Sequence, residues 1–311
     1  MPDVTVVIAT RNRSGLLGRT LERLAALPDR PAGVVVVDNA SVDGTPAMVA
    51  DRFPGVTVLP LRRNEGAVAR NHGVRAARTP YVAFADDDSW WAPGALARCA
   101  ALFDACPRLA LIAARTLVGP QEHVDPMADV LAAAPLGVPE DLPGPAVLGF
   151  LACSAVVRRD AFLACGGFDP VVFFIGEEQR MAWDLYSAGW GLAYCADVVA
   201  HHHPAPSTVR QRHHKEMLAA RNRALTAWMR RPVRVAAGMS AGLLRAAGAD
   251  PVARRAVLQL LARLPAGLAR RTAPRPSLEA VLERLDAPPP GTDDAPRAHR
   301  TPAAEPCRTR G

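Results

Sequence analysis

The sequence of 311 residues lacks several features that would assign a class at once. No apolar run approaches the roughly 18 uncharged residues that a membrane-spanning helix needs. Its six cysteines are scattered and form no Cys-x-x-Cys pair, which favours reduced structural thiols. The N-terminus starts with a strand-like run, without the basic flank and cleavage site of a signal peptide. We therefore expect a cytoplasmic location.

Two signatures of nucleotide binding are also missing. The first strand-like run is followed by Thr-Arg-Asn-Arg-Ser-Gly, which is not the Gly-x-Gly-x-x-Gly turn of dinucleotide-binding domains. There is no Gly-Lys-Ser/Thr phosphate loop, and the only lysine is Lys215. This scarcity argues against a nucleotidyltransferase, which usually needs a Gly- and Lys-rich triphosphate loop. If the chain binds a nucleotide, it must use side chains and a metal ion.

The charge is divided unevenly along the chain. A hydrophobic content of 50% and a charged content of 22% describe a globular protein. Residues 1–204 carry 17 arginines against 22 acidic residues, whereas residues 205–311 carry 20 basic and 8 acidic residues. We expect the chemistry in the acidic part. The basic part indicates an anionic partner, although its diffuse charge does not favour nucleic acid.

Apolar runs alternate with helical patterns through the acidic part. Strands are predicted at 4–9, 34–37, 56–61 and 81–85, each followed by a segment with helical or loop character. This alternation is typical of an α/β fold with an open, mostly parallel sheet flanked by helices. Residues 119–147, rich in Pro and Gly, are predicted to be a loop.

Three segments follow from these patterns. We predict a catalytic domain at 1–204, a basic helical extension at 205–286 and a disordered Pro-rich tail at 287–311. Two alternatives remain open for the Arg-rich helices. They lie on an anionic membrane surface, which would make the protein peripheral on its inner face, or they cover the catalytic domain.

The stretch Phe84-Ala85-Asp86-Asp87-Asp88 places three carboxylates directly after a predicted strand. On extended backbone Asp86 and Asp88 share one face and Asp87 points away. Because Mg²⁺ is usually held by one or two carboxylates together with substrate phosphates, the pair could hold a metal-bound diphosphate. The alternative is an acidic cluster that favours the dipole of the helix after Pro93.

Other polar residues support a ligand site at this edge of the sheet, where open α/β sheets bind ligands. Asp38 ends a neighbouring strand and could accept a hydrogen bond from a ribose hydroxyl or a base; its alternative role is a turn or helix cap. Arg70 and Asn71 could contact phosphate, or they could lie on an exposed helix face.

Five motifs in order resemble those of a family-2 glycosyltransferase. They are "VTVVIATRNR", "VVVVDNASVDGT", "RNEGAVARNHGVRAARTPYVAFADDD", "GGFD…GEEQRMAWDLYSAGW" and "VVAHHHP", and they span roughly residues 3–204. The resemblance implies an A-type glycosyltransferase fold, a nucleotide-sugar donor and a divalent metal, Mg²⁺ or Mn²⁺. It also implies inverting transfer of a hexosyl or deoxyhexosyl group to an acceptor hydroxyl, in cell-envelope polysaccharide, glycolipid or other glycoconjugate synthesis, with a lipid-linked acceptor among the options.

On the donor side, the resemblance assigns roles to five residues by position. Thr10 and Arg11 would line the pocket for the donor base, and Asp38 would hold the base or the ribose. The segment of Arg70 and Asn71 would lie near the diphosphate.

The resemblance also assigns the metal site and the base. Asp86 and Asp88 match the two ends of the family's Asp-x-Asp motif, with Asp88 as metal ligand, Asp86 toward the ribose and Asp87 grouped with the donor contacts. His201 matches the family's strand-end histidine and is predicted to join the metal shell. Glu178 stands where the family has its catalytic Asp, so a carboxylate base is kept with one more methylene. This departure leaves a non-catalytic nucleotide-sugar binding protein as the alternative function.

Overall fold

The structure, a computed structural model, describes residues 1–133 and 135–286. The predicted tail at 287–311 lies outside the described residues. Nine described strands form one sheet, which agrees with the predicted α/β class. The strands are β1 (Val4–Thr10), β2 (Gly33–Asp38), β3 (Thr57–Pro60), β4 (Tyr81–Ala85), β5 (Ser89–Trp91), β6 (Leu109–Val118), β7 (His123–Val124), β8 (Ala155–Arg158) and β9 (Gly191–His202).

The sheet runs in the order β3-β2-β1-β4-β8-β6-β9-β5, with β7 paired to β6. The first four strands are parallel, as the alternating pattern predicts. Beyond them β8 is antiparallel to both β4 and β6, and β5 is antiparallel to β9. The sheet is therefore mixed. Its parallel half contains β1, β2 and β4, whose carboxyl ends lead into the polar residues of the predicted site.

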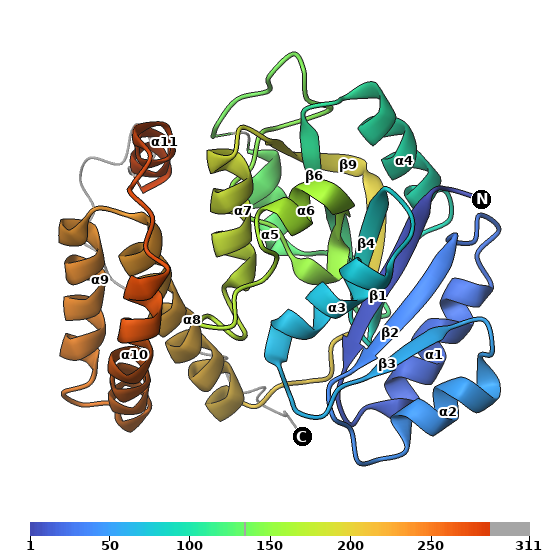
Figure 1. The fold of residues 1–311 in the computed structure, drawn as a ribbon, viewed down its shortest axis with the longest axis horizontal. Coiled ribbons are helices and arrows are strands. Elements are labelled where there is room, and N and C mark those ends of the chain that lie inside the picture. Colours follow the sequence, from blue (N-terminus) through green and yellow to red (C-terminus); the bar gives the residue numbers. More distant parts are fainter. Residues whose placement is uncertain (134, 287–311) are drawn as a thin grey trace, which may run out of the picture.

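Helices cover both faces of the sheet because the strand side chains alternate between two apolar clusters (Figure 1). On β1, Val6 and Ile8 point into one cluster and Val7 into the other. The first cluster is completed by α1 (Ser14–Ala25), α2 (Thr45–Arg52) and α4 (Ala95–Ala105). The second is completed by α3 (Ala69–Ala76), α6 (Arg159–Ala164) and α7 (Glu177–Ser187).

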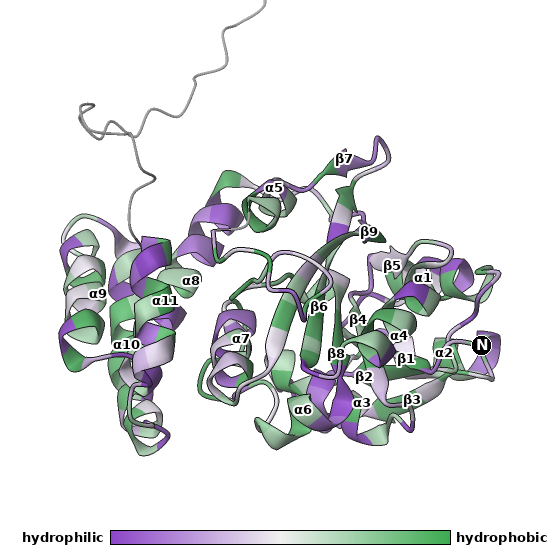
Figure 2. Cartoon of the chain, turned by 90° about the horizontal axis from the view of Figure 1, so that it is seen from above, coloured by the Kyte–Doolittle hydropathy of each residue, from purple (hydrophilic) through white to green (hydrophobic). Residues whose placement is uncertain are grey.

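The segment predicted as a loop, 119–147, contains regular structure. β6 extends to Val118 and turns back through β7, and α5 (Pro126–Ala132) follows. The Asp125 side chain caps α5 by accepting from the backbone N–H of Met127, and Pro126 opens the helix. Figure 2 shows β7 projecting at the rim of the sheet, with α5 between it and the C-terminal helices.

The basic C-terminal part forms α8 (Val209–Arg230), α9 (Val233–Ala246), α10 (Pro251–Ala269) and α11 (Pro276–Asp286), which stack beside α7 (Figure 1). They share an apolar cluster with Val171 and Val172 of the sheet-bearing part. Arg230 on α8 donates to Asp184 on α7 at 2.6 Å, and Leu278 and Leu282 of α11 enter the core beneath the sheet. These helices therefore cover the sheet-bearing part, one of the two alternatives left open by the sequence.

Among the described helices, none combines the length and the apolar character that crossing a bilayer requires.

Candidate functional site

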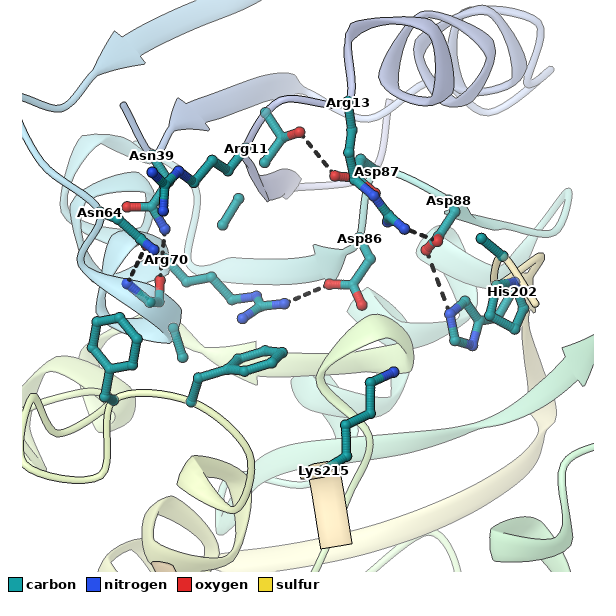
Figure 3. A pocket seen from close by; sticks show the side chains of 18 residues that line it. Arg11, Arg13, Asn39, Asn64, Arg70, Asp86, Asp87, Asp88, His202 and Lys215 are labelled. Atoms are coloured by element: carbon teal, nitrogen blue, oxygen red, sulfur yellow. Dashed lines mark hydrogen bonds and ion pairs between the residues drawn. The ribbon is translucent and has the colours of Figure 1, made fainter. Parts of the chain in front are cut away.

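A pocket of about 470 Å³ opens at the carboxyl ends of β1 and β4 (Figure 3). Thr10 ends β1 beside Asp38, its register partner on β2, and the acidic triplet follows β4. Parallel strands bring their carboxyl ends to one edge, so residues far apart in sequence meet here. The polar and charged residues of its wall are Thr10, Arg11, Arg13, Asn39, Asn64, Arg70, Asp86, Asp87, Asp88, His202 and Lys215.

The acidic triplet lies in a turn and not on extended backbone. The N–H of Ser89 donates to the carbonyl of Asp86, and the chain returns at once as β5. All three carboxylates consequently line the same pocket, which corrects the expectation that Asp87 points away. Asp87 accepts from the hydroxyl of Thr10 at 2.8 Å and from Arg13 at 2.5 Å. Burial raises the pKa of Asp87 to about 6, against the charge of Arg13.

Asp88 lies between a guanidinium and an imidazole. Arg13 donates to it at 3.0 Å, and Nε2 of His202 lies 3.4 Å from its other oxygen. Burial alone would raise the pKa of Asp88, but His202 and Arg13 outweigh burial and hold that pKa below its ordinary value. Burial likewise lowers the pKa of His202, whereas Asp88 raises it, and the net shift is upward. Asp88 is thus kept ionised at the pocket wall.

His202, and not His201, faces the acidic triplet. Successive side chains on a strand point to opposite faces, so the two neighbours on β9 diverge. His201 stacks on Trp90 with ring centroids 5.2 Å apart, and its Nδ1 lies 3.1 Å from Glu122. The sequence places three histidines in a row and does not fix which one faces inward. The candidate metal ligand on β9 is therefore His202 and not the predicted His201.

Asp86 pairs with a buried arginine that also approaches α7. Arg70 bonds the Asp86 carboxylate, and its other nitrogen lies 4.0 Å from Glu177. Burial lowers the pKa of Arg70, but the surrounding carboxylates, Glu178 among them, reverse this effect and raise it. Burial raises the pKa of Glu177 well above its ordinary value and also raises the pKa of Glu178. Arg70 thus joins the triplet electrostatically to the acidic start of α7.

The side chains near Asp88 fit a divalent cation. One potential ligand atom from each of Asp86, Cys153 and His202 lies within 4.8 Å of the other two. Burial raises the pKa of the Cys153 thiol well above 9.0, which keeps that sulfur protonated. Carboxylate and imidazole remain, a donor set suited to Mg²⁺ or Mn²⁺. The members of this group that would hold such an ion are Asp86 and His202, and Asp88 joins them because one of its oxygens lies 3.4 Å from Nε2 of His202.

Two predicted donor contacts do not reach the pocket wall. Asn71 is buried, and its side-chain amide donates to the carbonyl of Phe168 and accepts from its N–H, each at 2.9 Å. It therefore fixes the Gly-Gly-Phe-Asp turn and does not line the pocket. Asp38 is buried behind the wall, where one oxygen accepts from Ser41 and the other has no partner among the described residues. Asn39, the next residue, takes its place in the pocket.

Several wall residues were not predicted as site residues. Arg13 stands in the quoted "TRNR" motif, yet its pairing with two carboxylates depends on the turn after β4. Lys215 reaches the pocket from α8, and Figure 3 shows its side chain extending toward Asp86. Phe173 and Phe174 close the wall from the loop before α7. A lone lysine is a visible signal, but nothing in the sequence predicts that α8 folds back over the sheet.

Sequence comparison places the chain among known enzymes. The model of the family "Glycosyl transferase family 2" matches residues 5–165. An N-acetylglucosaminyl-diphospho-decaprenol L-rhamnosyltransferase of Mycobacterium tuberculosis is 30% identical, over 75% of this chain and 89% of the relative. A pre-mycofactocin glycosyltransferase of the same organism is 36% identical, over 65% of this chain and 43% of the relative.

Solved structures share the fold at lower identity. The mannosyltransferase PcManGT from Pyrobaculum calidifontis, in complex with GDP-Man and Mn²⁺, superposes with a TM-score of 0.55 and 22% identity, covering 92% of this chain and 79% of that chain. TarS 1–349 from S. aureus, in complex with UDP-GlcNAc, gives a TM-score of 0.57 and 16% identity, covering 90% and 87%. The fold is that of A-type glycosyltransferases, and the chain belongs to glycosyltransferase family 2.

Proposed function

We propose that the protein transfers a sugar from a nucleotide-sugar donor to an acceptor hydroxyl, with a divalent metal and with inversion at the anomeric carbon. The observation that carries this proposal is the convergence of Asp86, Asp88 and His202 on one pocket wall, with Arg70 linking it to the acidic start of α7. The acidic triplet and His202 suit a diphosphate and its metal ion. The acidic start of α7 supplies a carboxylate for proton transfer.

The donor is proposed to lie across the ends of β1 and β2. Thr10, Arg11 and Asn39 line that part of the pocket, and Asp38 lies directly behind it, with one oxygen that has no partner within residues 1–133 and 135–286. An unpartnered buried carboxylate oxygen is costly unless a ligand donates to it, so a small shift that exposes Asp38 to a base or ribose would be favourable. The exposed Arg11 is placed to contact the charged part of the nucleotide.

The leaving group is a nucleoside diphosphate, whose developing charge must be neutralised. A divalent ion held by Asp88 and His202 would supply Lewis-acid stabilisation there when bound. Arg13 now pairs with Asp87 and Asp88, so it must share or yield Asp88 when a cation binds. Released from Asp88, the Arg13 guanidinium would remain beside the diphosphate as a further positive charge.

Glu178 is proposed as the general base. It is the more exposed of the two acidic residues that open α7, whereas Glu177 is buried beside Arg70. Its raised pKa brings the carboxylate closer to the working pH, where a base transfers protons most effectively. Because Glu178 is on α7 and Asp88 follows β4, the base and the metal come from separate elements. That separation permits attack opposite the leaving group.

The sugar and the acceptor are proposed from the relatives. The first relative is named for transfer of L-rhamnose to a diphospho-decaprenol-linked acceptor, and another, 41% identical over 32% of this chain, is named for succinoglycan biosynthesis. Family members with these names act in envelope glycan synthesis. We therefore favour a hexosyl or deoxyhexosyl donor and a lipid-linked envelope acceptor.

A donor screen tests the proposal. The protein is incubated with uridine, guanosine and thymidine diphosphate sugars and with Mg²⁺ or Mn²⁺, and released nucleoside diphosphate is measured with and without chelator. We expect slow hydrolysis of one donor class, dependent on the metal, and a product of opposite anomeric configuration once an acceptor is supplied. Release that persists in chelator, or a product that retains the donor's configuration, would contradict the proposal.

A further inference from the structure

A second cavity of about 830 Å³ adjoins the donor pocket. It lies between the start of α8, the start of α10 and the loop that precedes α7. Arg13, Phe174, Ala205 and Lys215 line both cavities, so the two are continuous. We call the second cavity the α8–α10 groove. A molecule lying in this groove could extend directly into the donor pocket.

The α8–α10 groove is basic. Its wall contains the cations Arg13, Arg210, Lys215 and Arg255 together with His214, and among the described residues neither Asp nor Glu lines it. Arg210 and Arg255 are exposed, and neither side chain forms a hydrogen bond or ion pair within residues 1–133 and 135–286. Unpaired arginines facing one concave surface are suited to a phosphate or diphosphate, which guanidinium groups bind through paired N–H donors.

Apolar side chains line the same groove. Phe174 is 47% exposed, and Leu218 and Val252 join it from α8 and α10. The loop that presents Phe174 is fixed, because the Asn222 amide donates to the carbonyls of Phe174 and Ile175 at 2.8 and 2.6 Å. Ile175 has a φ of 64°, a conformation that is strained for a β-branched residue and that persists only when its surroundings hold it. The exposed ring is therefore a positioned element of the groove.

We propose that the α8–α10 groove binds an acceptor that carries a phosphate or diphosphate on an apolar chain. Arg210 and Arg255 would hold the phosphate, and Phe174, Leu218 and Val252 would contact the first carbons of the chain. The sugar on the far side of the phosphate then enters the donor pocket past Lys215. This inference rests on the proposed transfer reaction with a lipid-linked acceptor, and it adds the surface that binds the acceptor's phosphate and the start of its apolar chain.

Binding of farnesyl diphosphate tests the groove without any turnover. The full chain is titrated calorimetrically in chelator, so that a metal-dependent diphosphate site in the donor pocket does not contribute. We expect Arg210→Gln/Arg255→Gln to bind at least about tenfold more weakly, since two charge-assisted contacts are lost. The matched control is Arg245→Gln/Arg254→Gln, which removes two exposed arginines of α9 and α10 outside the groove and should bind like the wild type.

Further titrations distinguish binding in the groove from binding in the donor pocket or to a lipid surface. Arg11→Gln should bind farnesyl diphosphate as the wild type does, because Arg11 lines the donor pocket and not the groove, and farnesol should bind far more weakly because it lacks phosphate. Equal binding by wild type and Arg210→Gln/Arg255→Gln, or no binding by either, would overturn the inference. A third outcome would also overturn it: the wild type binds phosphatidylglycerol vesicles but not farnesyl diphosphate, and Arg210→Gln/Arg255→Gln loses the vesicle binding. If the protein showed these binding differences but transferred no sugar, the proposed transfer would be contradicted and the groove's binding of the phosphate-bearing chain would stand.

Discussion

Glu178→Gln is expected to lower the rate of sugar transfer by about 10²–10⁴-fold, the usual contribution of a general base. The amide keeps the size of the side chain and cannot accept the proton of the acceptor hydroxyl. Donor and metal binding should be unchanged, because among the described residues the Glu178 carboxylate accepts from the N–H of Gly176 and forms no hydrogen bond or ion pair with Asp88 or His202. Turnover and donor affinity, measured on the same preparation, check both halves of this expectation.

The pH profile adds a second readout for Glu178. A base acts when deprotonated, and burial raises the pKa of Glu178 above its ordinary value of 4.5. Transfer should therefore increase as the pH rises through that raised pKa, with the acid limb above pH 4.5, and Glu178→Gln should lose this limb. Glu178→Asp is the matched variant, since it restores the carboxylate type of the family and should keep the limb. Unchanged turnover in Glu178→Gln would show that Glu178 is not the base, whereas wild-type protein that binds the donor without any turnover would favour the non-catalytic binding protein.

Asp88→Asn is expected to reduce metal-dependent transfer by on the order of 10³-fold or more, because Lewis-acid stabilisation is worth several kcal/mol and about 1.4 kcal/mol is tenfold in rate. Asp88 is the carboxylate that His202 and Arg13 keep ionised, so the substitution removes the charge that attracts the cation. Titration with Mn²⁺, followed by electron paramagnetic resonance, should show weakened binding. Thermal unfolding should show that the fold is retained.

Asp51→Asn provides the control for this substitution. Asp51 is an exposed carboxylate on α2 that lies outside the pocket wall, so its loss changes the net charge equally. We expect wild-type Mn²⁺ affinity and transfer. If Asp88→Asn and Asp51→Asn behaved alike, Asp88 would not be a metal ligand.

Most of the parallel half of the fold could be predicted from the sequence, because β1 and β4 and most of β2 are buried on both faces. Val4–Thr10 and Gly33–Asp38 are apolar runs that end in polar residues, which marks both the strand and the edge where ligands bind. The other half, in which β8, β7 and β5 pair antiparallel and β6 and β9 pair parallel, was harder to predict. β8 has only four residues, and β7 and α5 lie in a segment whose Pro and Gly content is typical of a loop.

The site residues that were missed depend on contacts between distant segments. The choice of His202 over His201 depends on the register of β9 with β5, where Ser89 pairs with His202. The structural role of Asn71 depends on a turn 97 residues away, at Phe168. Lys215 reaches the pocket only because α8 packs over the catalytic part. Local patterns carry no information about any of these contacts.

The position of the metal tests the central claim most directly. Crystals grown with Mn²⁺ and a nucleoside diphosphate, measured for anomalous scattering from manganese, would locate the ion independently of any assay. The account predicts one strong peak within coordination distance of Asp88 and His202, in contact with the diphosphate. A diphosphate bound in this pocket without that peak, or manganese bound elsewhere on the chain, would contradict it.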